Sequence, residues 1–151
     1  MLPIKKILCP TDFSEPSQRG IEVAVELAEN FSAELILINV VTSTYPVGAP
    51  GVPPAYRVEE YHQEMMNFAT ESLEKMEREK VPQGVRRRKV VGQGNAADEI
   101  VEQAEREGVE LIVIATHGWT GWRRFVFGSV AEKVVRMASI PVLTIPGPAE
   151  K

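Results

Sequence analysis

Short apolar runs alternate along the chain with longer segments in which apolar residues recur every three or four positions. The short runs predict buried strands, and the periodic segments predict amphipathic helices. Because the two kinds of segment alternate, we expect an α/β fold: one doubly wound, mostly parallel five-stranded sheet with helices on both faces. The expected strands are residues 4–10, 34–41, 85–91, 111–115 and 141–145.

The expected helices begin at polar residues that can cap them. Ser14 directly precedes a helical pattern that has Pro16 in its first turn. Asn95 stands three residues before Asp98, the spacing of a capping pair. A long charged helix is expected over residues 56–80.

Charge and proline mark the two strands that we expect at the sheet edges. Residues 86–89 read RRRK, and such charges discourage the addition of a further strand. The last strand, Pro141 to Ile145, is apolar, and an apolar edge favours pairing with a two-fold copy. The sequence therefore predicts a homodimer through this strand, and replacing Leu143 and Ile145 by lysine is expected to give a monomer.

Composition limits the class of protein. A chain of 151 residues with 44% hydrophobic and 25% charged residues supports a single domain spanning residues 1–151, whose core covers about residues 4–146. The net charge of −4 argues against nucleic-acid binding, and the RRRK charges would alternate between the two faces of a strand. No apolar run approaches the length of a membrane helix. Because Cys9 is the single cysteine, a reducing compartment is expected, and the protein is predicted to be cytoplasmic. The net charge and the short apolar runs predict neither nucleic-acid nor membrane partners.

Two glycine-rich stretches are candidates for ligand binding. The first, GQGNAA at residues 92–97, matches a dinucleotide-binding fingerprint between a strand and a helix. That fingerprint also needs an acidic residue at the end of the next strand, where this chain has Ala115 and Thr116. A tight turn is therefore the favoured interpretation, and a cofactor site is the alternative.

The second stretch, ATHGWTGWRRFVFGS, runs from Ala115 to Ser129 and leaves the most apolar strand. It starts at the carboxyl edge of the sheet, where open α/β sheets bind ligands. Gly118 and Gly121 let the backbone approach a ligand closely. Gly128 and Ser129 precede the last helix, whose free N–H groups favour a phosphate. The stretch predicts a phosphate-binding loop, with a glycine-rich loop that binds no ligand as the alternative.

Other candidate residues lie at the same sheet edge. Asp12 ends the first strand, where a carboxylate can accept hydrogen bonds from ribose hydroxyls or an adenine amine, or can serve as a turn residue at a helix start. The proline-rich residues 42–55 predict a flexible cover over this edge. Cys9, His117 and Asp12 could form a thiol-based catalytic site. A cysteine within the first strand is expected to be buried, however, which argues against this enzyme.

The chain resembles the universal stress protein family over residues 4–145. The segments that carry the resemblance are ILCPTDFSEPSQRGIEVAVELA, ELILINVV, DEIVEQA and VELIVIATHGWTG with FGSVAEKVVRMASIPVLTI. The family's phosphate motif is G-x2-G-x9-G-[ST], which Gly118, Gly128 and Ser129 match. Ala115 stands at the first glycine of the motif, and Trp119 where many relatives have arginine.

This resemblance implies a Rossmann-like fold of the adenine nucleotide alpha hydrolase type and a nucleotide-dependent stress-response or signalling role as a homodimer. The implied ligand is ATP or another adenine nucleotide, with Mg²⁺ left open. Binding without catalysis is expected; slow ATP hydrolysis, or a protein-interaction module without nucleotide, is the alternative. The resemblance and the composition of the loop together assign the nucleotide site to ten residues: Pro10, Thr11, Asp12, Val40, Ala115, Gly118, Gly121, Gly128, Ser129 and Val130.

Overall fold

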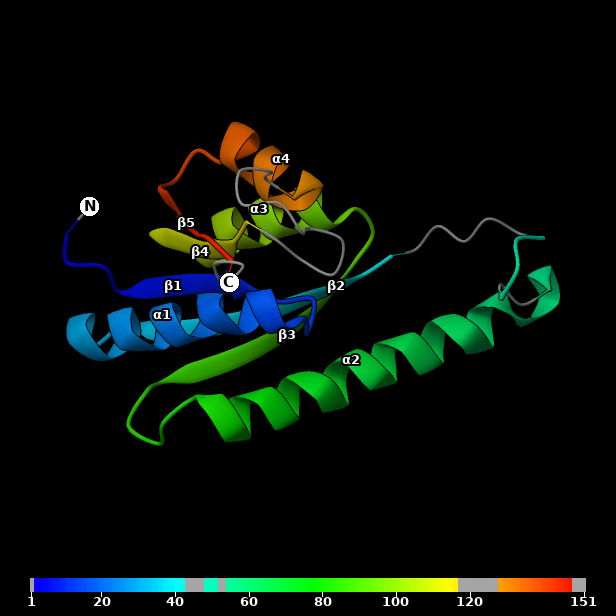
Figure 1. The fold of residues 1–151 in the computed structure, drawn as a ribbon, viewed down its shortest axis with the longest axis horizontal. Coiled ribbons are helices and arrows are strands. Elements are labelled where there is room, and N and C mark those ends of the chain that lie inside the picture. Colours follow the sequence, from blue (N-terminus) through cyan, green and yellow to red (C-terminus); the bar gives the residue numbers. More distant parts are fainter. Residues whose placement is uncertain (1, 43–47, 52–53, 117–127, 148–151) are drawn as a thin grey trace.

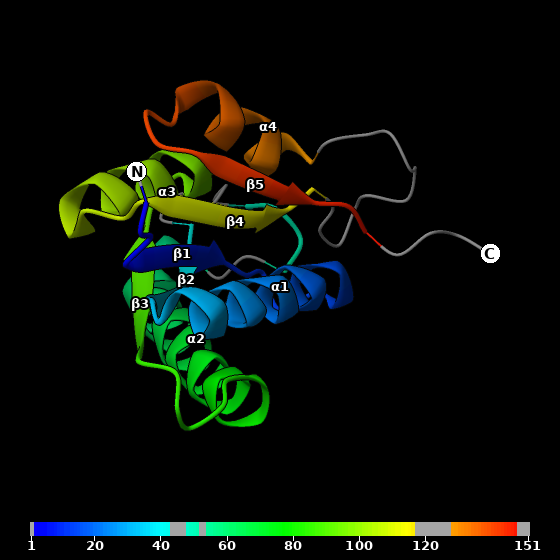
Figure 2. The same ribbon diagram turned by 90° about the vertical axis from the view of Figure 1, so that its left-hand side faces the viewer.

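A parallel sheet lies between two layers of helices in the computed structural model of the chain (Figures 1 and 2), which describes residues 2–42, 48–51, 54–116 and 128–147. Within these residues the sheet has five strands in the order β3-β2-β1-β4-β5, and all four strand pairings are parallel. The α/β fold expected from the sequence is confirmed. The strands are β1 (Lys6–Pro10), β2 (Glu34–Val41), β3 (Arg87–Gln93), β4 (Leu111–Ala115) and β5 (Val142–Ile145).

The helices divide evenly between the two faces of the sheet (Figure 2). The helices α1 (Glu15–Phe31) and α2 (Val58–Lys80) pack on one face, and α3 (Ala96–Glu107) and α4 (Ser129–Met137) pack on the other. A short 3-10 helix, Ala55–Arg57, precedes α2. Figure 1 shows that the N-terminal end of α2 extends well past the sheet. None of the described helices is both long and apolar enough to cross a membrane.

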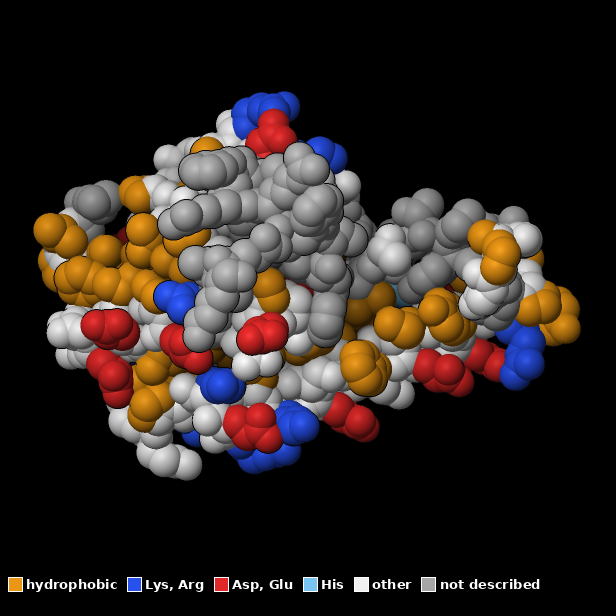
Figure 3. All heavy atoms as spheres, viewed as in Figure 1, with side chains coloured by type: hydrophobic (Ala, Val, Ile, Leu, Met, Phe, Trp, Pro, Cys, Tyr) orange, Lys and Arg blue, Asp and Glu red, His pale blue; other side chains and the backbone are white. Residues whose placement is uncertain are grey.

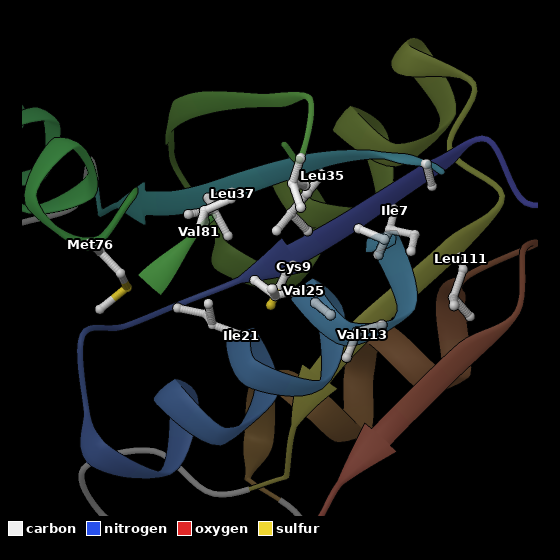
Figure 4. Close-up of a cluster of buried hydrophobic side chains, with 14 of the residues drawn as sticks. Ile7, Cys9, Ile21, Val25, Leu35, Leu37, Met76, Val81, Leu111 and Val113 are labelled. Atoms are coloured by element: carbon white, nitrogen blue, oxygen red, sulfur yellow. The ribbon is translucent and has the colours of Figure 1, made fainter. Parts of the chain in front are cut away.

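The central strands β1, β2 and β4 are buried on both faces. Side chains alternate along each strand, so that Leu37 packs under α1 and α2 whereas Ile36 and Ile38 pack under α3 and α4. This two-sided burial explains why the sequence of these strands is continuously apolar rather than alternating. Burial of one such side chain contributes about 1.5–3 kcal/mol, and Figure 4 shows several of them filling the space between α1 and the sheet.

Most element boundaries agree with the sequence. The bounds of β2 and β4 are those predicted, whereas β1 begins two residues later, and β3 lies two residues further along than residues 85–91. The shift of β3 has a physical cause: Val85 is buried in the core from a turn, where its N–H donates to the Pro82 carbonyl at 3.1 Å. Val85 therefore made the predicted strand begin two residues too early, although this valine is buried outside the sheet.

The predicted helix caps are confirmed. The Ser14 hydroxyl accepts from the Ser17 N–H at 3.3 Å, and Asn95 Oδ1 accepts from the Asp98 N–H at 3.2 Å. Each cap satisfies an amide that the first helical turn leaves without a backbone partner.

The charged strand β3 forms one edge of the sheet, as predicted. Arg88 bonds Glu34 at 2.8 Å and Glu107 at 2.6 Å, and the hydrogen bond from Arg88 lowers the pKa of Glu107. Arg87 lies 3.5 Å from Glu77 on the other face of the sheet. The arginines of this run therefore point to both faces and bond within the chain, and they form no continuous basic stripe.

Candidate functional site

A cavity of about 320 Å³ opens at the carboxyl edge of the sheet, where the ends of β1, β2 and β4 meet the starts of α3 and α4. The chain runs from β1 outward to β2 and β3, and then returns to the other side of β1 to form β4 and β5. The cavity therefore lies at the point where the strand order reverses, the usual ligand site of open α/β sheets.

Eight of the ten predicted site residues line this single cavity, although they come from four separate segments of the sequence. These residues are Pro10, Thr11, Asp12, Val40, Ala115, Gly128, Ser129 and Val130. The other two, Gly118 and Gly121, lie outside the described residues, as do His117, Trp119 and part of the proline-rich segment predicted as a cover.

The turn after β1 holds Asp12 at the cavity by a set of short-range hydrogen bonds. The Phe13 N–H donates to Thr11 Oγ1 at 3.0 Å, and the Ser14 N–H donates to Asp12 Oδ1 at 3.0 Å. Asp12 therefore acts as a turn residue at the start of α1, one of the two roles that the sequence allowed. Because it is exposed and also lines the cavity, the other role remains compatible with its position.

Phe13 adopts a left-handed backbone conformation with φ of 65°. This conformation costs a residue with a side chain roughly 1–2 kcal/mol. The Phe13 ring meets the Phe68 ring of α2 edge-on, with a centroid separation of 6.4 Å, a contact that stabilises by about 0.5–1.5 kcal/mol. The contact with α2 thus offsets part of the cost of the turn that carries Asp12.

The start of α4 forms a second side of the cavity. The Gly128 N–H donates to the Thr116 carbonyl, and Ser129 is the first residue of the helix. A Cβ added to Gly128 would lie 2.9 Å from that carbonyl oxygen, although the Gly128 φ of −59° suits any residue. Glycine is therefore needed here because two backbone segments approach closely. Ser129 and Val130 of the first turn line the cavity, and the N–H groups at a helix start favour an anion.

The GQGNAA stretch forms a tight turn between β3 and α3, as favoured. Gly94 has φ of 114°, and its N–H donates to the Val41 carbonyl at 2.9 Å. The stretch also contributes Ala96 to the wall of the cavity, a contact that the sequence allowed only under the alternative of a cofactor site in this stretch.

The remaining wall of the cavity is mainly aliphatic. Ile38 of β2, Ile100 of α3 and Ile114 of β4 line it. A mainly apolar cavity with a few polar groups in its wall is typical of small-molecule sites. The arrangement therefore suits a ligand with a planar apolar part and an anionic part directed at the start of α4.

Three polar residues of the cavity were missed by sequence reasoning: Ser17, Asn39 and Thr116. Asn39 Nδ2 donates to the Thr11 carbonyl at 2.8 Å, and the Ser17 and Thr11 hydroxyls lie 2.9 Å apart. The signal that could have revealed Asn39 is its polar side chain inside the apolar run ELILINVV.

Cys9 lies in the core and not at the cavity. Its side chain is fully buried beside Ile21 and Val25 (Figure 4), and burial raises the pKa of its thiol to about 12. Since the thiolate is the reactive form of cysteine, this position disfavours the thiol enzyme considered from the sequence.

We expect Cys9 of the native protein to resist alkylation by iodoacetamide at pH 8 over hours, because neither the reagent nor a thiolate is accommodated in the core. In guanidinium chloride it should react within minutes, and mass spectrometry distinguishes the two states. Stoichiometric labelling of the native protein would show that Cys9 is accessible and restore the thiol enzyme as a candidate.

No group of three or more His, Cys, Asp or Glu side chains is arranged to hold a metal ion within the described residues.

Comparisons with known proteins match the fold and the sequence together. The model of the universal stress protein family matches residues 3–146. Universal stress protein MJ0531 of Methanocaldococcus jannaschii is 37% identical over 147 residues, which cover 97% of this chain and 85% of that protein.

Solved structures of this family also match the chain in fold. The structure of protein MJ0577, also from Methanocaldococcus jannaschii, superposes with a TM-score of 0.78 and 30% identity, covering 97% of this chain and 99% of the other. The universal stress protein from Archaeoglobus fulgidus in complex with dAMP has a TM-score of 0.56 at 22% identity, with coverages of 96% and 99%. At that identity the likeness concerns the fold.

Proposed function

Because the chain belongs to the universal stress protein family, we propose that it is a cytoplasmic stress-response protein that binds ATP, or another adenine nucleotide, in the cavity at the carboxyl edge of the sheet. The observation that carries this proposal is the meeting, in one cavity, of Asp12, Val40 and the start of α4 at Ser129. A relative of the same fold has been solved with dAMP, which supports an adenine nucleotide as the ligand class.

The two ends of the cavity suit the two ends of such a nucleotide. At one end Asp12 would accept hydrogen bonds from the ribose, beside Val40 and the aliphatic wall that would hold the base. At the other end Gly128, Ser129 and Val130 would present backbone N–H groups and the Ser129 hydroxyl to the phosphates. Mg²⁺ would enter with the phosphates.

Binding, with at most slow hydrolysis, fits the chemistry of the cavity. Asp12 is the single carboxylate among the described residues that line it, and its Oδ1 is engaged by the Ser14 N–H. Rapid phosphoryl transfer relies on positioned metal ions and charged groups around the transferred phosphate.

Native mass spectrometry of the freshly purified protein tests the proposal. We expect a population of chains carrying one adenine nucleotide each, released on denaturation and identified by its mass. The proposal fails if the purified chain carries no nucleotide and acquires none after incubation with millimolar ATP.

We further propose that the protein forms a homodimer through β5. This strand is an edge of the sheet, and its Leu143 side chain is 38% exposed. Figure 3 shows hydrophobic side chains gathered on the side of the molecule where Figure 1 draws the beginnings of β1 and β4, and β4 is the strand next to β5 in the sheet. Pairing of two β5 edges would remove apolar surface from water and satisfy the edge backbone groups.

Leu143→Lys alone is the variant that tests this dimer. The sequence suggested replacing Ile145 as well, but Ile145 is buried in the core and a lysine there would unfold the protein. We expect the parent to sediment as a dimer at micromolar concentration and Leu143→Lys as a monomer. Phe31→Lys is a matched control, because Phe31 is equally exposed, at 37%, at the end of α1. A monomeric parent would contradict the proposal.

A further inference from the structure

Asn39 is the polar exception in the apolar strand β2. Its side chain is half-buried and lines the cavity, and its amide Nδ2 donates to the carbonyl oxygen of Thr11 at 2.8 Å. The hydrogen bond joins two segments separated by 28 residues in the sequence. It therefore connects the body of the sheet to the turn that carries Asp12.

Thr11 is the residue through which this turn is fixed. Its N–H donates to the Ile38 carbonyl at 2.9 Å, and its hydroxyl accepts from the Phe13 N–H at 3.0 Å. The same hydroxyl lies 2.9 Å from the Ser17 hydroxyl. The bond from Asn39 engages the remaining backbone group of Thr11, a residue that is only 5% exposed.

The peptide carbonyl that Asn39 holds belongs to the bond between Thr11 and Asp12. Rotation of this peptide would swing the Asp12 backbone away from its place at the cavity, and with it the carboxylate. A partly buried carbonyl that loses its donor either stays unsatisfied or turns to find another partner. Removing the Asn39 amide is therefore expected to release the orientation of Asp12.

We propose that Asn39 is a positioning residue for the nucleoside end of the site: through the Thr11 carbonyl it presets Asp12 in the orientation that binds the ribose. This inference rests on the proposed nucleotide function. A preset polar group binds its ligand more tightly because the ordering is complete before the ligand arrives. This role would account for a polar amide within an otherwise apolar strand.

A residue that acts through Asp12 has a distinct signature in a double-mutant cycle. Asn39→Leu should lower adenosine affinity about tenfold in the parent, and by less than about twofold when Asp12 is already alanine, because interacting residues are non-additive. Binding of inorganic tripolyphosphate, which has no ribose, should change little in either background. A general loss of structure would lower the affinity for both ligands and add to the effect of Asp12→Ala.

The experiment is calorimetric titration of adenosine and tripolyphosphate into the parent, Asn39→Leu, Asp12→Ala and the double variant. Asn39→Ser, whose short hydroxyl cannot span to the Thr11 carbonyl, is measured in parallel in case leucine disturbs folding. Asn30→Leu is the matched control, because Asn30 Nδ2 also donates to a backbone carbonyl at 2.8 Å, that of Glu26 in α1. It should leave both affinities unchanged.

The outcomes separate this inference from the function on which it rests. If the parent binds neither adenosine nor tripolyphosphate, the proposed function fails, and the role of Asn39 with it. If the parent binds adenosine but folded Asn39→Leu and Asn39→Ser bind it equally well, or lose affinity additively with Asp12→Ala, the function stands and the positioning role of Asn39 is wrong.

Discussion

Replacing Gly128 by valine is expected to lower the affinity for ATP by about a hundredfold or more, equivalent to about 2.7 kcal/mol. The Cβ alone would lie 2.9 Å from the Thr116 carbonyl oxygen. That oxygen belongs to the backbone, so it cannot rotate away as the end of a flexible side chain can. The first turn of α4 would have to move away from β4, carrying Ser129 and Val130 out of the cavity. The measurement is calorimetric titration with ATP.

Gly84→Val is the control for Gly128→Val. Nothing lies within 4 Å of a Cβ built at Gly84, so a side chain there meets open space. Circular dichroism should show that both variants are folded, and Gly84→Val should bind ATP like the parent. If Gly128→Val also binds ATP within threefold of the parent, the start of α4 does not form the phosphate side of the site.

Asp12→Ala and Ser129→Ala are expected to act on different parts of the ligand. A hydrogen bond to a charged group contributes on the order of 1.5–3 kcal/mol, or roughly tenfold to a hundredfold in affinity. Ser129→Ala should therefore weaken ATP by this factor and leave adenosine nearly unchanged. Asp12→Ala should weaken ATP and adenosine by similar factors, because it would contact the ribose that both contain.

Titration of both ligands into both variants measures this difference. Thr144→Ser, a small change at a residue of β5 that does not itself line the cavity, serves as a neutral comparison. Equal losses of ATP and adenosine affinity in Ser129→Ala would show that Ser129 acts on the fold or on the nucleoside, and would remove it from the phosphate side.

Much of the fold followed from local patterns because the physical causes are themselves local. The bounds of β2 and β4 agree with their apolar runs since these strands are buried on both faces, and Ser14 and Asn95 cap helices through contacts only three residues apart. Val85 misled the strand prediction because its side chain is buried by packing against the core that α2 covers. A valine buried from a turn cannot be distinguished in the sequence from a valine that begins a strand.

The candidate site was predicted less completely, for an equally physical reason. Glycine and hydroxyl residues at strand ends identify a ligand-binding edge. The hydrogen bond from Asn39 to Thr11, however, joins residues 28 positions apart, and no repeating pattern in the sequence indicates such a contact. The sequence singled out Gly128 because it directly precedes the last helix, whose N–H groups favour a phosphate. The structure adds a second cause, the close approach of the Thr116 carbonyl.

Calorimetric titration of the unmodified protein with ATP, after any carried nucleotide has been removed by unfolding and refolding, tests the central claim most directly. We expect saturable binding of one ATP per chain, with adenosine competing for the same site because it would share the contacts at Asp12 and Val40. Absence of binding up to millimolar ATP, by a refolded chain with the native circular dichroism spectrum, would contradict the account.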